Sequence, residues 1–196
     1  MEWLVPLVVF SVVSSGSPGP NNLMLWASGA AFGLRRTLPH AVGTALGIGA
    51  TALAAAAGLA ALVAAVPALA FAMKVAGSVY LLYLAWQIAR AGDLHQATMA
   101  RPFTLRQAAL FQVLNPKAWT FALGAVTTFR PAELPMAAGA IAVAVTMMLV
   151  IVPTALAWAV AGGALARVMT SPRTRRVASL ALAATVVATV ALVWLD

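Results

Sequence analysis

Long stretches without a charged side chain constrain this chain more than any other feature of its sequence. Four stretches contain no Asp, Glu, Lys or Arg: residues 3–34, 37–73, 134–166 and 177–195. A helix that crosses the hydrocarbon core of a bilayer needs about 20 consecutive apolar residues. The sequence therefore predicts that residues 1–196 form one all-α transmembrane domain, surrounded by the lipid bilayer and without a separate soluble domain.

The overall composition agrees with this interpretation. Of 196 residues, 12 are Lys or Arg and 4 are Asp or Glu, so that 8% are charged, whereas a soluble domain usually has about 25%. A soluble globule with so few polar side chains could not cover its surface, and a disordered chain would be less apolar. The cations lie in short segments between apolar runs, so the net charge of +8 does not indicate binding to nucleic acid.

The apolar runs and the residues between them predict six membrane-spanning helices. The run of residues 37–73 is too long for one such helix, so we place a turn near Pro67. The first helix could instead fold back at its Gly/Pro cluster as a re-entrant hairpin, which would leave five. The six predicted segments are approximately Trp3–Phe32, Pro39–Val66, Ala68–Ala89, Gln107–Phe129, Leu134–Ala166 and Val177–Leu195.

Basic residues are distributed asymmetrically between the two ends of these segments. Nine of them follow the first, third and fifth segments, whereas Lys74 and Arg130 lie toward the opposite end. Cytoplasmic loops are enriched in Lys and Arg, so these three loops are predicted to be cytoplasmic and both termini to lie outside the cell. The nine residues are Arg35, Arg36, Arg90, Arg101, Arg106, Arg167, Arg173, Arg175 and Arg176.

Polar, helix-breaking residues interrupt two of the apolar segments near their middles. Ser17–Asn22 interrupts the first segment, and Asn115–Lys117 interrupts the fourth. Proline lacks an amide donor and frees a carbonyl one turn back, and lipid offers such groups no partner. Interrupted helices at corresponding positions of two halves point to a transporter binding site. Three helices per half invert the second half, so we predict two inverted repeats, about 1–92 and 103–196, whose breaks face each other.

The residues at these breaks suit a small zwitterion such as an amino acid. Helix N-termini attract a carboxylate, and the amides of Asn21, Asn22 and Asn115 can accept from an ammonium group. Lys117 would place a cation near mid-membrane, where an ionisable residue indicates function. Two alternatives stay open: the prolines only kink the helices, or Lys117 only pins the fourth helix to neighbouring carbonyls. The candidate substrate-binding residues are Pro18, Gly19, Pro20, Asn21, Asn22, Tyr80, Asn115, Pro116 and Lys117.

Several aromatic side chains are open to two interpretations. Tyr80, Tyr83 and Trp86 recur at helical spacing, which is more typical of packing or of an aromatic belt at the membrane surface than of a ligand cage. His40 lies near the predicted cytoplasmic end of the second segment. We interpret it as a residue of the membrane interface and not as a proton gate.

Two pairs of glycines have the spacing of closely packed membrane helices. Gly29 and Gly33 form one GxxxG pair, and Gly43 and Gly47 form the other. Glycine at this spacing lets two helix backbones approach closely, so both pairs are predicted to lie at helix–helix contacts.

Three motifs occur in this chain in a characteristic order: Ser17–Asn21, Gly77–Trp86 and Phe111–Lys117. Their order, their spacing and the chain length resemble the LysE/RhtB superfamily of amino-acid exporters from end to end. The pairing of Pro-Gly-Pro-Asn with Asn-Pro-Lys is the specific part of this resemblance. Within the superfamily, Ala109–Asn115 and Thr127–Phe129 are most similar to the cysteine/O-acetylserine exporter branch.

This resemblance implies a secondary transporter that exports amino acids or close derivatives from the cytoplasm across the bacterial inner membrane, driven by the proton gradient. Both termini would then be periplasmic. The resemblance carries over Pro18–Asn21 and Asn115–Lys117 as motif positions. Many members have an acidic or histidine residue in the second segment, but Gly47–Ala52 of this chain contains neither. Lys117 is then the candidate for proton coupling, unless the substrate itself carries the charge.

Other classes of protein explain the sequence less well. With no cysteine, two histidines and no carboxylate inside a predicted span, an enzyme, a metal site and a cofactor are not expected. A non-transporting accessory subunit of a larger membrane complex is the alternative function, although it would leave the interrupted helices unexplained. The expected partners are a small amino-acid-like substrate and lipid, and the small size is compatible with a homodimer.

Overall fold

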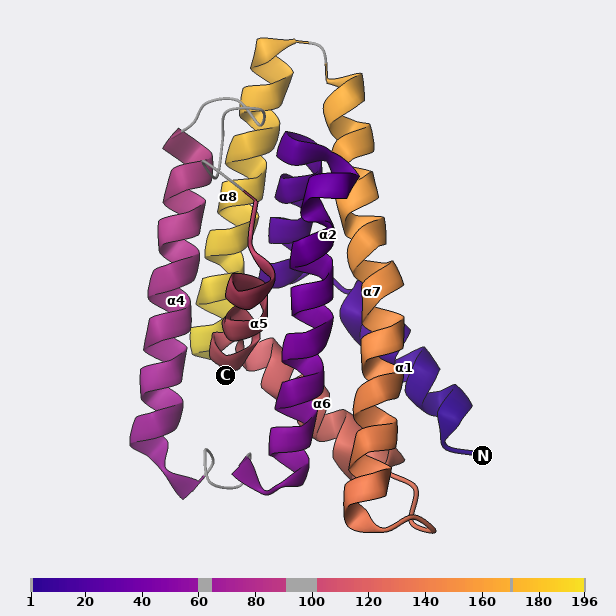
Figure 1. Ribbon diagram of the computed structural model, residues 1–196. Coiled ribbons are helices and arrows are strands. Elements are labelled where there is room, and N and C mark those ends of the chain that lie inside the picture. Colours follow the sequence, from indigo (N-terminus) through magenta and orange to yellow (C-terminus); the bar gives the residue numbers. More distant parts are fainter. Residues whose placement is uncertain (1, 60–64, 91–101, 170, 196) are drawn as a thin grey trace.

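The computed structural model describes residues 2–59, 65–90, 102–169 and 171–195, and within these ranges every regular element is an α-helix (Figure 1). A helix satisfies its backbone hydrogen bonds internally, which a chain surrounded by lipid requires. The helices are α1 (Leu4–Gly16), α2 (Pro20–Ala56), α4 (Pro67–Arg90), α5 (Leu105–Leu114), α6 (Pro116–Phe129), α7 (Met136–Val168) and α8 (Pro172–Leu195). The all-α class is confirmed for the described part of the chain.

The first predicted break separates α1 from α2. Ser17 and Gly19 have extended backbone conformations, and Pro20 occupies the first turn of α2, where its missing amide hydrogen is not needed. Asn21 and Asn22, which we expected within the break, already belong to that helix. The interruption is therefore shorter than predicted.

The chain does not fold back on itself at this break. Helix α7 runs beside it throughout: Leu7 of α1 shares an apolar cluster with Met147, and Asn22 lines a cavity with Thr154. Further along, a Cβ on Gly29 would meet the backbone of Ala159. Both sequence numbers rise together, so α1 and the start of α2 follow one direction beside α7, as Figure 1 also shows. The first segment is an interrupted helix and not a re-entrant hairpin.

Helix α2 is bent into a hairpin at Gly33. The backbone there has φ 76° and ψ 170°, a combination in the left-handed region that favours glycine. On either side, the hydroxyls of Ser28 and Thr37 lie 2.9 Å apart, and Thr44 Oγ1 donates to Asn21 Oδ1 at 3.1 Å. These pairs align the two arms in antiparallel fashion. Residues 20–32 therefore complete the first predicted segment, and residues 34–56 form the second.

The second predicted break separates α5 from α6 at a single residue. Asn115 has φ −93° and ψ 107°, outside the helical region, and Pro116 begins α6. Asn115 Oδ1 accepts from the amide of Lys117, so the asparagine caps the new helix. At its other end, α5 starts with a capping box made by Thr104 and Gln107. The two short helices are thus defined by local sequence signals.

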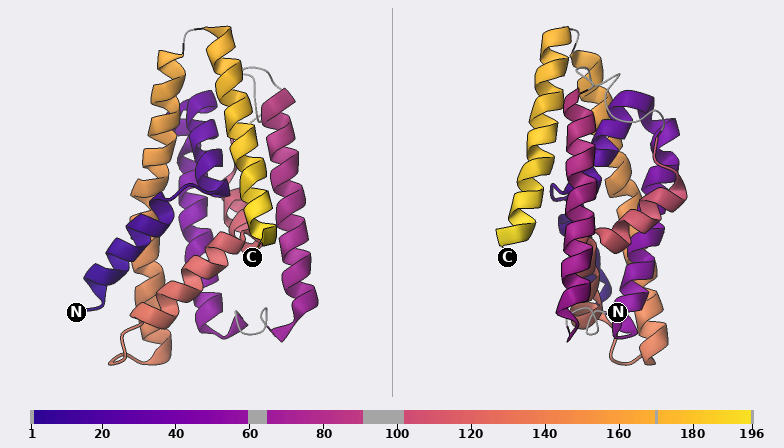
Figure 2. Two further views of the ribbon diagram at one scale, coloured as in Figure 1. Left: turned by 180° about the vertical axis from the view of Figure 1, so that it is seen from behind. Right: turned by 90° about the vertical axis from the view of Figure 1, so that its left-hand side faces the viewer.

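Helix α2 lies at the centre of the fold and packs against α5, α6 and α7, while α4 and α8 pair beside it (Figure 2). At one end of that pair, Trp194 Nε1 donates to Ser78 Oγ at 2.9 Å. Two apolar clusters form most of the described core. One joins the start of α2 to α4, α5 and α8, and the other joins α1, the second arm of α2, α6 and α7.

The distribution of polar side chains is that of a membrane protein. Leu149 is 71% exposed and Val168 is 78% exposed, whereas the amide side chain of Gln112 is 1% exposed. A soluble monomer rarely exposes large apolar side chains over so much of its surface. By length and composition, two of the described helices, α2 and α7, can each cross a membrane, and α1 is a shorter apolar helix. The outer surface of the bundle is therefore suited to lipid.

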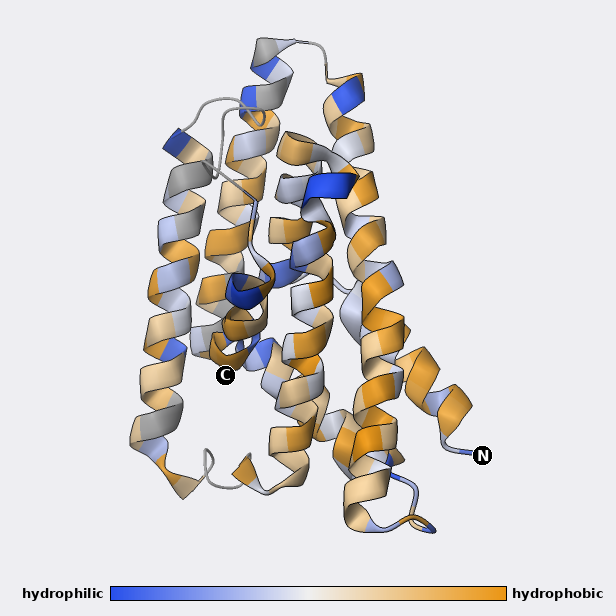
Figure 3. Ribbon diagram, in the orientation of Figure 1, coloured by the Kyte–Doolittle hydropathy of each residue, from blue (hydrophilic) through white to orange (hydrophobic). Residues whose placement is uncertain are grey.

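Hydrophilic residues gather at one end of the bundle, as Figure 3 shows. The bend of α2, the end of α4 and the connection between α7 and α8 all lie there (Figure 1). Six of the nine arginines belong to these elements and are exposed: Arg35, Arg36, Arg90, Arg167, Arg173 and Arg176. Arg101 lies outside the described residues. The N-terminus lies toward the opposite end.

The glycine pairs are only partly explained by helix packing. A Cβ on Gly43 would meet the carbonyl oxygen of Leu105, and one on Gly47 would lie 2.7 Å from the carbonyl oxygen of Ala109, so this pair does contact α5. Gly29 contacts α7 in the same way. The packing interpretation is wrong for Gly33, because a Cβ there would meet nothing within 4 Å and the residue instead forms the bend of α2.

We predict that Gly162→Ala destabilises the bundle, because its Cβ would meet the carbonyl oxygen of Trp26 where α7 crosses α2. Overpacking by one methyl group typically costs about 1–3 kcal/mol, which should lower the melting temperature in detergent by roughly 2–12 °C. Gly16→Ala is the matched control, because a Cβ there has no neighbour within 4 Å. Equal melting temperatures for the two variants would contradict close packing at Gly162.

Candidate functional site

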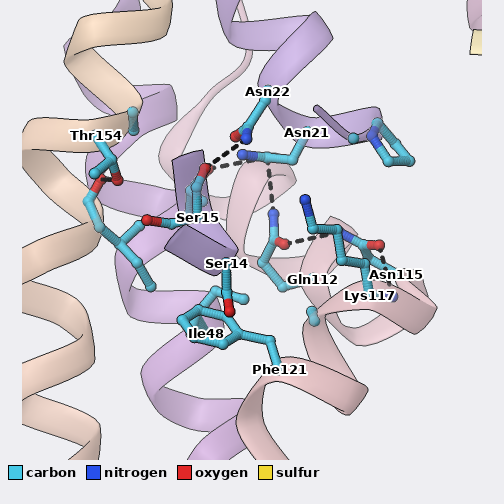
Figure 4. Close-up of a pocket in the computed structure, with 16 residues that line it drawn as sticks. Ser14, Ser15, Asn21, Asn22, Ile48, Gln112, Asn115, Lys117, Phe121 and Thr154 are labelled. Atoms are coloured by element: carbon cyan, nitrogen blue, oxygen red, sulfur yellow. Dashed lines mark hydrogen bonds between the residues drawn. The ribbon is translucent and has the colours of Figure 1, made fainter. Parts of the chain in front are cut away.

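A cavity lined by both polar and apolar side chains lies between the two helix breaks (Figure 4). The cavity volume is about 40 Å³, which is enough for a few water molecules. Its walls come from α1, both arms of α2, α5, α6 and α7. The lining residues are Ser14, Ser15, Gly19, Pro20, Asn21, Asn22, Thr44, Ile48, Gln112, Asn115, Lys117, Ala118, Phe121, Ile151, Thr154 and Ala155.

A chain of buried amides joins the two breaks across this cavity. Asn21 Oδ1 accepts from Gln112 Nε2 at 2.9 Å and from Thr44 Oγ1 at 3.1 Å. Gln112 Oε1 accepts in turn from Asn115 Nδ2 at 3.2 Å. Asn21 and Asn115, which are far apart in the sequence, are thereby connected through one glutamine.

Asn22 binds the end of α1. Its Nδ2 donates to the carbonyl oxygens of Ser15 at 2.6 Å and Ser17 at 2.8 Å. The last carbonyls of a helix have no partner within that helix, and a nearby donor must replace the missing amides. Asn22 thus satisfies the carbonyls that the first break exposes.

Lys117 reaches from the second break to the first. Its Nζ donates to Ser17 O at 2.9 Å, to Ser17 Oγ at 2.7 Å and to Pro18 O at 3.2 Å. These three bonds use all three ammonium hydrogens. The ammonium also lies at the C-terminal end of α1, where the helix dipole favours a cation. Lys117 therefore ties the fourth predicted segment to the carbonyls at the end of α1, which is the kind of contact that our structural alternative for this lysine expected.

Gly19 makes room for this lysine. A Cβ at position 19 would lie 3.0 Å from both Cδ and Nζ of Lys117, closer than ordinary contact. Gly19 itself has an extended backbone that any residue could adopt. The presence of glycine at position 19 is thus explained by the space that the Lys117 side chain occupies.

The structure brings together six of the nine candidate residues named from the sequence. Gly19, Pro20, Asn21, Asn22, Asn115 and Lys117 all line the cavity. Pro18 contributes only its carbonyl oxygen, and Pro116 begins α6 without lining the cavity.

Tyr80 lies apart from these residues. Its ring packs 5.5 Å from that of Phe111 and edge-on to Phe103, in the apolar cluster between α4 and α5. Tyr83 and Trp86 are each 53% exposed on the outer side of α4. This arrangement agrees with packing and a surface belt, the interpretation we favoured for the aromatic stripe.

Sequence reasoning missed five polar residues of the cavity. Gln112 precedes Asn115 by one helical turn, so the two share a face of the fourth segment, and that spacing could have identified it. The others are isolated hydroxyls in apolar helices, which are common and give a weak signal. The missed residues are Ser14, Ser15, Thr44, Gln112 and Thr154.

His40 is not at the surface of the protein, and its interpretation as a residue of the membrane interface is wrong. The side chain is fully buried, neither ring nitrogen has a hydrogen-bond partner, and the ring stacks on Phe103 at 5.0 Å. Phe103 lies just before α5. Because α5 packs on the second arm of α2, Phe103 covers the imidazole of His40.

Interrupted helices whose polar groups converge on a buried cavity, inside a bundle with an apolar exterior, define a membrane transporter. The chain belongs to the family of LysE type translocators, whose family model matches residues 12–195. Members of this family are multi-pass proteins of the inner membrane, and they are transporters and not enzymes. The resemblance drawn from the motifs is confirmed.

Several curated relatives are named cysteine/O-acetylserine efflux protein. The relatives from Escherichia coli strain K12 and Shigella sonnei strain Ss046 are each 25% identical to this chain over 153 residues, which is 78% of both chains. The relative from Escherichia coli O1:K1 is 24% identical over the same length and shares. No solved structure matches the chain.

We predict that Lys117→Met destabilises the protein, because Ser17 and Pro18 lose the only cation that binds their carbonyls among the described contacts. Charged hydrogen bonds contribute about 1.5–3 kcal/mol, so the melting temperature in detergent should fall by roughly 3–12 °C.

The chain's one other lysine provides the matched control for this measurement. Lys74 Nζ lies 5.0 Å from the centre of the Trp194 ring. A cation–π contact of this kind contributes about 0.5–1 kcal/mol, so Lys74→Met should lower the melting temperature by less than about 4 °C. A Lys117→Met variant as stable as the wild type would show that the lysine is not needed to bind α1.

Proposed function

We propose that this protein exports amino acids or small amino-acid derivatives from the cytoplasm across a bacterial inner membrane. The observation that carries the proposal is the cavity where the two interrupted helices meet, since an ionisable residue and several polar side chains gather there inside an apolar bundle. Family membership and the printed names of the relatives support amino-acid export. The accessory-subunit alternative gives the cavity no purpose.

The cavity favours a small, polar, uncharged side chain on the substrate. Hydroxyls and amides make up most of its polar wall, and Ile48, Phe121 and Ile151 limit its size. Among the described lining residues Lys117 is the one charged side chain. The relatives' names give cysteine and O-acetylserine as their substrates, so we propose these two as the first candidates here.

The N-terminus of α2 is the proposed site for the substrate carboxylate. Gly19 precedes this helix and provides no side-chain cap, whereas Asn115 caps the N-terminus of α6. We propose that the first amides of α2 donate to this carboxylate, at the positive end of the helix dipole. The oxygen-rich wall of Ser14, Ser15 and Thr154 would accept from the substrate ammonium.

Lys117 is proposed to link substrate binding to movement. Its ammonium binds the end of α1 through Ser17 and Pro18. A substrate carboxylate at the start of α2 would compete for this ammonium, since a carboxylate is a stronger acceptor than a carbonyl. Partial transfer of Lys117 to the substrate would loosen α1, so that the two halves could rock around the site.

The proposed architecture is a pair of inverted three-helix repeats, about 1–92 and 103–196, in one transporter domain. In this arrangement α1 with the first arm of α2 corresponds to α5 with α6, the second arm of α2 to α7, and α4 to α8. Two features support the pairing: a proline begins the second half of each interrupted helix, and α4 packs on α8.

The proposed orientation places the arginine-rich end in the cytoplasm and both termini in the periplasm. The gathering of exposed arginines at the bend of α2 and the ends of α4 and α7 supports it through the positive-inside rule. A homodimer, which the small size of the chain allows, stays a prediction.

Purified protein in liposomes should catalyse counterflow of radiolabelled cysteine and O-acetylserine, and lysine should not compete, because the cavity lacks a described carboxylate. Lys117→Met should reduce the initial rate by about tenfold or more, while Lys74→Met should stay within about twofold of the wild type. Counterflow of no amino acid in a panel of twenty would favour the accessory-subunit alternative.

Proton coupling through Lys117 predicts a different result for Lys117→Arg. Arginine keeps the charge and the donors that bind α1, but it does not release a proton. Counterflow without a gradient should survive in this variant, whereas acceleration of export by an imposed pH gradient should be lost. If the rate of wild-type export does not change with the imposed pH gradient, the proton-coupling hypothesis is wrong.

A further inference from the structure

Ser11 is a polar residue that the proposed binding site does not use. Its side chain is fully buried in α1, and its hydroxyl has no hydrogen-bond partner among the described residues. Residues three and four positions apart share a helix face, so Ser11 lies between Leu7, in the apolar cluster with α6 and α7, and Ser14 and Ser15, which line the cavity. Ser15 Oγ also donates to Ser11 O at 2.6 Å. The unpartnered hydroxyl therefore lies one turn beyond the cavity, toward the N-terminal end.

Three aromatic rings pack together where α1 contacts α6. Phe121 forms part of the cavity wall (Figure 4), and its ring centre lies 5.5 Å from that of Phe10 on α1. Phe10 also packs 5.2 Å from Phe129, at the far end of α6. This aromatic cluster fills the contact between α1 and α6, the two helix halves that lead from the cavity to the N-terminal end of the bundle (Figure 1).

Helix α1 is the element best able to open this contact. Its opposite face carries four exposed valines: Val5, Val9, Val12 and Val13. The extended residues Ser17–Gly19 separate it from α2, so it can pivot without bending a helix. Its inner end is bound by the hydrogen bonds of Asn22 and Lys117, and its outer half contacts α6 through Phe10.

We propose that the seam between α1 and α6 is the route by which substrate leaves the cavity, with Ser11 as a polar contact along it and Phe10, Phe121 and Phe129 as its closure. The proposal rests on the proposed function. A hydroxyl with no partner costs free energy in an apolar interior, and a passing amino acid would provide the partner that the closed seam lacks. Pivoting of α1 separates Phe10 from α6 and exposes Ser11 to water.

Cysteine accessibility tests this route directly, because the chain has no cysteine of its own. In Ser11→Cys, one thiol reports whether water reaches position 11, since a charged methanethiosulfonate reagent reacts with the hydrated thiolate. The reagent is added separately to each side of the membrane, in wild-type and Phe10→Ala backgrounds, with and without saturating O-acetylserine. Counterflow of the same variants is measured in parallel.

Ser179 provides the matched control. It is a second fully buried serine whose hydroxyl has no partner, but it lies in α8, away from the cavity. Ser179→Cys should stay unreactive under every condition in which Ser11→Cys reacts. A general loosening of the bundle by Phe10→Ala would instead expose both positions.

The proposal expects Phe10→Ala to accelerate labelling of Ser11→Cys by about tenfold or more, since the reaction follows the population of the open form. It expects labelling from the N-terminal side only, and faster labelling with substrate. An unreactive Ser11→Cys in both backgrounds, labelling from the arginine-rich side, or equal acceleration at position 179 would each overturn it. The Phe10→Ala comparison needs no substrate, so it is decided even if the protein exports no amino acid.

Discussion

The structure depends on one constraint: backbone groups freed where a helix is interrupted must find partners inside the protein, because lipid offers none. The first break exposes the carbonyls of Ser15, Ser17 and Pro18, and the donors that meet them are Asn22 and Lys117. Lys117 belongs to the second break. Each interruption therefore needs the other, which brings two distant parts of the chain together at one depth in the bundle.

The same requirement creates the site. Polar side chains that satisfy the breaks must be buried together, and the amides of Asn21, Gln112 and Asn115 complete one another across the space between them. The cavity is thus a consequence of how the interruptions are satisfied. It also explains why binding and movement can be linked, since a ligand that competes for Lys117 competes for a bond that restrains α1.

Much of the fold follows from local signals. The stretches without charged residues predict membrane-spanning helices. Pro20 and Pro116 each mark the start of a new helix after a break, because proline lacks an amide donor and fits a first turn. Pairwise contacts were predicted less well. Gly33 has the spacing of a packing glycine yet forms a bend, and His40 lies near a helix end yet is covered by the segment before α5. Both outcomes depend on which elements become neighbours.

The sequence by itself determined that this chain is a membrane protein of interrupted helices, since apolar length and proline position act on the chain locally. It also singled out six of the sixteen residues that line the cavity. Only the tertiary structure decided that Lys117 binds the end of α1, that Gln112 joins Asn21 to Asn115, and that Tyr80 belongs to a different cluster. A hydrogen bond needs two groups within about 3 Å, and the packing of α2 against α5, α6 and α7 sets those distances.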